Sequence, residues 1–213
     1  MAIKLYGHPL SPAAQRVRVC LEEKELEYEF EFVDLSSGQQ KKEPFISLNP
    51  FGVVPVLQDG DLTLFESRAV TQYITHNYAD KGTPLVPKDP KKMAMVSVWV
   101  EVESQSFDAA ASKISFELVV KPMLGMAIDE SVVAANEGKL ASILDIYESR
   151  LAASKYIGGD AYSLADLHHL PIINNLFRTK IKALFEARPH VSAWCADILG
   201  RAAWQKVVAT MKH

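Results

Sequence analysis

The sequence predicts two domains of different class, an α/β domain followed by an all-helical domain. Three observations lead to this prediction. Strand and helix signals alternate as far as Tyr78, proline and glycine then gather between residues 80 and 90, and apolar residues beyond that point follow a helical period. We therefore expect an α/β domain over residues 1–79, a linker over 80–90 and an all-helical domain over 91–213.

The first half of the α/β domain has the order strand, helix, strand. Residues 3–6 are a short strand that ends at a Gly-His-Pro sequence. Ser11 then supplies the N-cap, and Pro12 the first position, of a helix that runs to about Lys24. Residues 28–33 alternate as a second strand.

The second half predicts a short helix, a hairpin and a final helix. The short helix lies around Phe45. Two short apolar runs, 53–57 and 62–65, flank an Asp-Gly-Asp turn, and this arrangement is a strong hairpin signal. The final helix runs from Ser67 to about Tyr78.

The all-helical domain is predicted by its periodicity and by one clear helix start. Apolar residues at helical spacings are Val133, Leu140, Leu144, Tyr147 and Leu151. Ser163 stands as an N-cap with Asp166 at the third helical position, which is the pattern of a capping box.

Composition and charge exclude several kinds of partner. The chain has 213 residues and a formal net charge of -3, with no run of five or more like charges, so neither nucleic acid nor a membrane surface is expected as a partner. Cys20 and Cys195 are far apart and belong to no metal-spaced cluster, so we expect two buried thiols and no metal site. The first residues lack a signal-peptide pattern, which predicts a cytoplasmic protein.

Four segments carry a resemblance to a known family: KKEPF at 41–45, NPFGVVP at 49–55, LFESRA at 64–69 and SLADL at 163–167. Together with the α/β-then-α plan, they make the chain similar to the glutathione S-transferases, whose N-terminal domain has a thioredoxin-like fold. The sequence from Gly7 to Ser11 and the PMLG segment at 122–125 resemble the plant phi class.

The resemblance implies that Ser11 is the catalytic residue. Its hydroxyl would donate a hydrogen bond to the glutathione sulfur, and the helix N-terminus would add positive potential there. Both effects favour thiolate over thiol, and about 1.4 kcal/mol of such stabilisation lowers a pKa by one unit. The alternative is that Ser11 only caps its helix.

The resemblance also implies a set of residues that bind glutathione as the co-substrate. The glycyl carboxylate would meet Gln40 and Lys41, the cysteinyl backbone a cis Val54–Pro55 peptide, and the γ-glutamyl group Glu66 and Ser67. The chain departs from the usual phi-class pattern at Gln40, where many members have histidine, and at Val53, where many have glutamine. Surface exposure of Lys41 and simple capping by Ser67 are the alternatives.

The electrophile pocket is expected between the two domains. Its predicted lining is Leu10, Pro12, Phe116, Leu118 and Phe177, and plain core packing is the alternative for each of them. The adjacent His168 and His169 lack metal spacing, so we expect one to be packed and the other exposed.

These features predict an enzyme that conjugates glutathione to hydrophobic electrophiles, with reduction of organic hydroperoxides as a related activity. The alternative is a non-catalytic carrier of small hydrophobic ligands such as flavonoids or hormones, and the Ser11 hydroxyl favours catalysis over carriage. Glutathionyl transfer would require cysteine in place of Ser11. The family implies a homodimer, and no permanently bound cofactor is expected.

Overall fold

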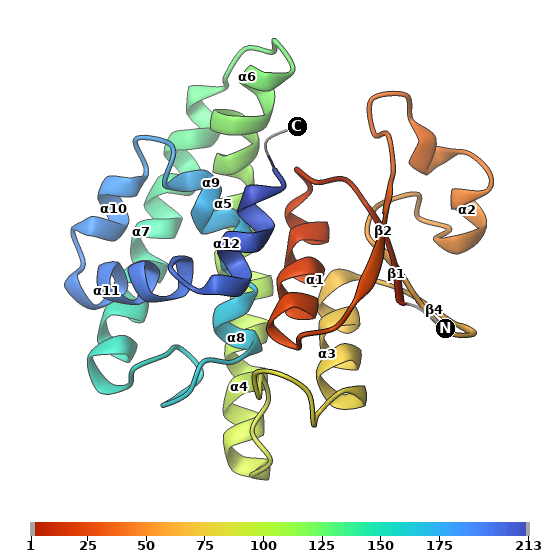
Figure 1. The fold of residues 1–213 in the computed structure, drawn as a ribbon. Coiled ribbons are helices and arrows are strands. Elements are labelled where there is room, and N and C mark those ends of the chain that lie inside the picture. Colours follow the sequence, from red (N-terminus) through yellow and green to blue (C-terminus); the bar gives the residue numbers. More distant parts are fainter. Residues whose placement is uncertain (1–2, 212–213) are drawn as a thin grey trace. The chain divides into compact units, whose positions relative to one another are not determined.

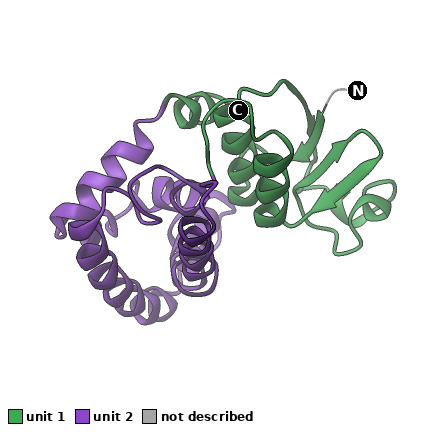
Figure 2. Ribbon diagram, turned by 90° about the horizontal axis from the view of Figure 1, so that it is seen from below, with its two compact units in different colours: residues 1–85, 202–213 green, residues 86–201 purple. Residues whose placement is uncertain are grey.

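The computed structural model describes residues 3–211, and its fold is the predicted α/β sheet domain with a helical domain. The chain divides into two compact units (Figure 2). Unit 1 comprises the residues up to Leu85 together with those from Ala202, and unit 2 comprises Val86–Arg201. The division at Leu85 falls inside the stretch expected to be a linker. The return of the last helix to unit 1 is a feature that the sequence analysis did not predict.

Unit 1 is a four-stranded sheet with helices (Figure 1). Its elements are β1 (Ile3–Gly7), α1 (Pro12–Glu23), β2 (Tyr28–Phe32), η1 (Gln39–Lys41), α2 (Phe45–Leu48), β3 (Val56–Asp59), β4 (Leu62–Phe65), α3 (Ser67–Asn77) and α12 (Ala202–Ala209). The strand order is β2-β1-β3-β4, in which β1 and β2 are parallel and the other two pairs antiparallel.

The predicted strand at 53–57 begins later than expected. Pairing of β3 with its neighbours starts at Val56. Pro55 has no N–H to donate to a ladder, so the residues up to this position form a loop instead of strand. The loop is fixed by Asn49, which is buried and whose Nδ2 donates to the Val53 carbonyl at 2.7 Å.

Helix α1 is buried on nearly every side because α3 and α12 both pack against it. In α12, Trp204 and Val207 are buried, and Lys206 Nζ lies 3.4 Å from Glu22 Oε2 of α1. Cys20 of α1 is fully buried, as is Cys195 of unit 2, which confirms the expectation for both thiols.

Unit 2 is helical throughout its regular elements. They are α4 (Pro90–Val102), η2 (Glu103–Phe107), α5 (Asp108–Ser115), η3 (Phe116–Val120), α6 (Lys121–Met123), α7 (Glu130–Ala153), α8 (Leu164–Leu167), α9 (Leu170–Leu176), α10 (Lys182–Glu186) and α11 (Pro189–Leu199). Two of these, η2 and η3, are single π-helical turns that interrupt the run from α4 to α6.

The predicted capping box at the start of α8 is formed, and it is part of a larger buried network. Asp166 Oδ2 accepts from the backbone N–H and the hydroxyl of Ser163, each at 3.0 Å. Its Oδ1 accepts from the Ile157 N–H and from Trp194 Nε1, each at 2.9 Å. Burial raises the pKa of the Asp166 carboxyl to about 6, although these four donors favour its ionised form.

The expectation that one of His168 and His169 would be exposed is wrong, because both are fully buried. His169 Nε2 lies 3.0 Å from the Tyr147 hydroxyl, and its Nδ1 lies 2.7 Å from the Ala165 carbonyl. His168 Nδ1 lies 4.0 Å from the buried carboxylate of Glu103. Polar partners inside the unit therefore accommodate both rings.

Candidate functional site

Sheet register brings three of the predicted site segments to one edge of unit 1. Tyr6 of β1 pairs with Val56 of β3, and Val56 pairs with Phe65 of β4. The chain leaves β1 toward Ser11, enters β3 from Pro55 and leaves β4 toward Ser67, so all three segments begin at this row of paired residues. The core below the row is formed by a cluster of buried and partly buried residues that includes Val33, Phe45, Tyr6, Val54 and Phe65.

Ser11 is the N-cap of α1 and is half-buried. Its Oγ accepts from the Ala14 N–H at 3.4 Å, and Pro12 follows as the first helical residue. A hydroxyl that accepts in the cap still has its own hydrogen to donate. Capping and donation to a ligand are therefore compatible roles for this side chain.

Ser67 is the first residue of α3 and is buried. The preceding Glu66 is exposed and has a φ of 68°, a left-handed conformation that is uncommon outside glycine. The Val70 N–H donates to the Glu66 carbonyl at 2.9 Å as the first bond of the helix. The N–H groups of the residues before Val70 lie at the open end of α3, where an anion is favoured.

Ser67 Oγ accepts a hydrogen bond from Arg16 Nη1 of α1 at 2.9 Å. Arg16 is 3% exposed. Sequence reasoning missed this residue, because an arginine in the middle of a helix gives no local sign of burial.

The Val54–Pro55 peptide bond is cis, which confirms the prediction. Pro55 is buried and Val54 is half-buried at the entry to β3. Sequence reasoning also missed Asn49, whose bond to the Val53 carbonyl holds this loop.

Gln40 and Lys41 lie in the 3-10 turn η1, next to the loop that leads to Val54. Lys41 is exposed, and its Nζ donates to the Phe51 carbonyl at 3.0 Å. Gly52 has a φ of 58°, and a Cβ at this position would lie 2.8 Å from Lys41 Cδ and 2.9 Å from the Gln40 carbonyl oxygen. Gln40 Oε1 is buried without a hydrogen-bond partner within residues 3–211.

The predicted pocket residues are divided between the units. Leu10, which is 37% exposed, and the half-buried Pro12 flank Ser11 in unit 1. In unit 2, Phe116 is 45% exposed in η3, while Leu118 and Phe177 are half-buried. The pocket as a whole stays a prediction.

Asn175 Nδ2 donates to Ser115 Oγ at 3.0 Å, and this bond links α9 to the end of α5. Phe116 follows Ser115 directly, and Phe177 is the C-cap of α9, two residues after Asn175. The two aromatic residues therefore belong to neighbouring segments of unit 2.

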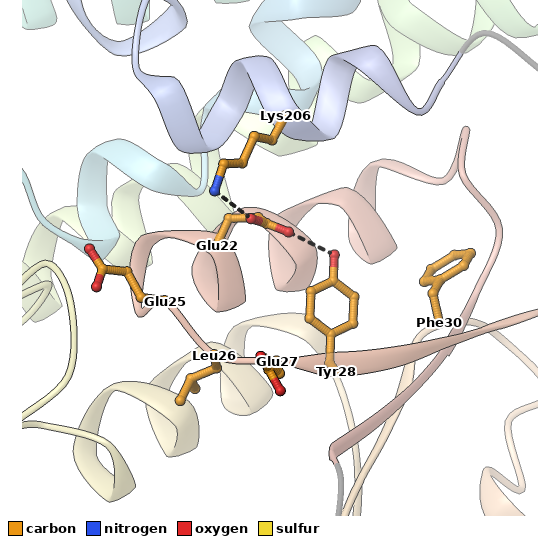
Figure 3. A pocket seen from close by; sticks show the side chains of 7 residues that line it. All are labelled: Glu22, Glu25, Leu26, Glu27, Tyr28, Phe30 and Lys206. Atoms are coloured by element: carbon orange, nitrogen blue, oxygen red, sulfur yellow. Dashed lines mark hydrogen bonds and ion pairs between the residues drawn. The ribbon is translucent and has the colours of Figure 1, made fainter.

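A cavity of about 580 Å³ lies elsewhere in unit 1 (Figure 3). Its lining is Glu22, Glu25, Leu26, Glu27, Tyr28, Phe30 and Lys206. The Tyr28 hydroxyl and the Lys206 ammonium both point to the Glu22 carboxylate, at 3.3 Å and 3.4 Å. Three carboxylates on its wall make this cavity unsuitable for an anionic peptide such as glutathione.

Among the described residues, no helix is long and apolar enough to cross a membrane. Within the same residues, no three histidine, cysteine or acidic side chains are grouped as metal ligands.

Comparison with known proteins gives consistent matches over the chain. Family models of the glutathione S-transferase N-terminal and C-terminal domains match residues 1–76 and 107–202. A glutathione S-transferase of Hyoscyamus muticus is 62% identical over 208 residues, which cover 98% of each chain.

Solved structures give the same result. Glutathione transferase F7 from Populus trichocarpa has a TM-score of 0.96 with 45% identity and full coverage of both chains. Glutathione S-transferase I from maize, in complex with an atrazine glutathione conjugate, has a TM-score of 0.92 with 40% identity, covering 100% of this chain and 99% of that one.

Proposed function

Because the chain belongs to the glutathione S-transferase family and has plant F-class relatives consistent with the phi class, we propose that it adds the glutathione thiolate to hydrophobic electrophiles with Ser11 as the stabilising donor. The observation that carries the proposal is the sheet edge from which the segments that hold Ser11, Val54 and the N-terminus of α3 all start.

The charges and donors at this edge suit the groups of glutathione. The thiolate would meet the Ser11 hydroxyl and the positive end of α1. The γ-glutamyl carboxylate would meet the open N–H groups of α3 and the Ser67 hydroxyl, with Glu66 at the amine. The glycyl carboxylate would meet Lys41 and Gln40, and the cysteinyl backbone would pair with Val54.

No general base is needed in this mechanism. Hydrogen bonds to a charged group contribute about 1.5–3 kcal/mol, enough to lower a thiol pKa near 8.5 into the neutral range. With an aryl chloride, the thiolate forms a C–S bond and chloride leaves. In the related hydroperoxide reduction, the thiolate attacks the peroxide oxygen, the O–O bond breaks and the alcohol leaves; a second glutathione then converts the sulfenic acid to glutathione disulfide and water. A homodimer, and glutathione as co-substrate without a permanently bound cofactor, belong to the same proposal.

The test is a substrate panel with and without glutathione: an aryl chloride, an organic isothiocyanate and cumene hydroperoxide. Ser11→Ala is expected to lower kcat about tenfold or more, with little change in the KM for glutathione, because the lost bond stabilises the thiolate. Ser11→Gly is the matched variant, since glycine keeps most of the capping stability without a hydroxyl.

Equal losses in the two variants would identify the hydroxyl as the cause, whereas full activity in Ser11→Gly would return Ser11 to a capping role. A carrier would bind the panel compounds and turn over none of them.

Gln40→His restores the residue that is usual in the phi class. We expect it to lower the dissociation constant for glutathione by less than about tenfold and to leave kcat unchanged, because an imidazole N–H, charged when protonated, would replace the amide as the donor to the glycyl carboxylate. Calorimetric titration measures the change. Weaker binding would show that the buried Oε1 environment is adapted to the amide of Gln40.

A further inference from the structure

We propose that Arg16 is a positioning residue for glutathione: its buried guanidinium sets the direction of the Ser67 hydroxyl, so that this hydroxyl donates to the γ-glutamyl carboxylate. The inference rests on the proposed function, since it assumes that the carboxylate binds at the N-terminus of α3. Arg16 itself would not touch the ligand.

The geometry that supports this role is a hydrogen bond between α1 and α3 of unit 1. Arg16 Nη1 donates to Ser67 Oγ at 2.9 Å, and the two residues are 3% and 6% exposed. A hydrogen bond between two buried groups is not in competition with bulk water, so it holds the hydroxyl in one orientation.

The chemistry of the two groups fixes which one donates. A guanidinium has five N–H donors and no acceptor, so Ser67 Oγ must be the acceptor in this pair. The hydroxyl hydrogen is then left for another acceptor. Because Ser67 is the first residue of α3, its hydroxyl belongs to the same helix end as the backbone N–H groups that lack a helical partner.

The charge of Arg16 acts in the same direction as the helix end. A guanidinium stays protonated at every physiological pH, so its positive charge beside Ser67 adds to the attraction of the α3 N-terminus for an anion. Arg16 thus contributes both the orientation of one donor and part of the local potential.

Arg18 provides a matched control two residues along the same helix. It is also buried, at 7% exposed, but its Nε donates to the Tyr28 hydroxyl at 3.4 Å and its Cζ lies 4.7 Å from the centre of the Phe30 ring. Replacing Arg18 therefore removes a buried arginine from α1 without touching Ser67.

The experiment compares Arg16→Met, Arg16→Lys, Arg18→Met, Ser67→Ala and the double variant of Arg16→Met with Ser67→Ala. Each is assayed by aryl chloride conjugation with glutathione and with an analogue whose γ-glutamyl group is replaced by γ-aminobutyryl, which keeps the amine and lacks the carboxylate.

Arg16→Met is expected to raise the KM for glutathione about tenfold, as for the loss of one charge-assisted hydrogen bond, while kcat and the KM for the analogue change less than about twofold. Arg16→Lys should recover part of the loss, and Arg18→Met should show none. The double variant should be no worse than the more affected single variant, because both changes remove one interaction.

Two failures are distinguishable. If Ser67→Ala does not weaken the binding of glutathione relative to the analogue, the Ser67 hydroxyl does not contact the carboxylate, and the proposed function is wrong at this contact. If Ser67→Ala does so but Arg16→Met behaves as Arg18→Met, or raises both KM values equally, the inference about Arg16 is overturned. Should Arg16→Met fail to fold, Arg16→Lys compared with Arg18→Lys makes the test, with a smaller rise in the KM for glutathione expected in Arg16→Lys alone.

Discussion

Asp166→Ala is expected to lower the free energy of unfolding by about 3 kcal/mol or more. The capping box alone is worth about 1–2 kcal/mol. The structure adds two donors that the box does not include, the Ile157 N–H and Trp194 Nε1, and all four donors would be left buried without an acceptor. For a chain of this size the melting temperature should fall by about 6–12 °C.

The pH dependence of this effect has a definite sign. The pKa of Asp166 is raised to about 6 in the folded protein, against about 3.9 in an unfolded chain. The pH-dependent part of its contribution to stability is therefore complete below about pH 4 and is lost as the pH rises through about 6. The loss caused by Asp166→Ala should be larger at pH 5 than at pH 7.5.

The measurement is the melting temperature of Asp166→Ala, compared with that of Asp160→Ala. Asp160 is the control because it is an exposed aspartate of the same segment, and its removal changes the net charge by the same amount. Glutathione affinity is expected to be unchanged in both. Equal melting temperatures for the two variants would contradict the network around Asp166.

Ser11→Cys is expected to change the class of reaction. A thiol at the N-terminus of α1 should have a lowered pKa and face the glutathione sulfur. Its thiolate attacks the glutathionyl sulfur of a mixed disulfide, the S–S bond breaks and the other thiol leaves. A second glutathione thiolate then attacks the protein mixed disulfide and leaves as glutathione disulfide, which restores the cysteine thiolate.

Conjugation should fall about tenfold or more in this variant, because two thiolates repel each other and a thiol is a poor donor. Thiol transfer should rise from near zero, measured with the glutathione mixed disulfide of hydroxyethanethiol. Mass spectrometry should find one glutathionyl adduct at position 11.

The native cysteines are an internal control for this experiment. Both are buried, and burial raises the pKa of the Cys20 thiol to about 12. An adduct on Cys20, or neither adduct nor transfer activity, would contradict the placement of residue 11 at the sulfur.

Local rules were sufficient for the strand and helix order and for the capping box, because each depends on residues close together in sequence. The N-cap at Ser11 and the turn around Gly60 are of this kind. The position of Pro55 explains the one strand that began late, since a missing N–H outweighs the apolar character of residues 53–55.

Features that join distant segments were not predictable in this way. Arg16 reads as an ordinary helical arginine until Ser67, 51 residues later, is brought beside it. Adjacent residues of a helix point to different sides of it, so helical periodicity predicts that either His168 or His169 is exposed to solvent. Both are buried because Tyr147 and Glu103, from other helices, cover the two sides.

The return of α12 to unit 1 has a consequence for synthesis. The ribosome synthesises all of unit 2 after α1 and before α12. Until α12 is made, the surface of unit 1 that Trp204 and Val207 will cover is therefore exposed to water. The first unit therefore reaches its complete core only after the second has been translated. Unit 1 expressed separately would have to include α12, joined through a linker, to bury the same apolar surface.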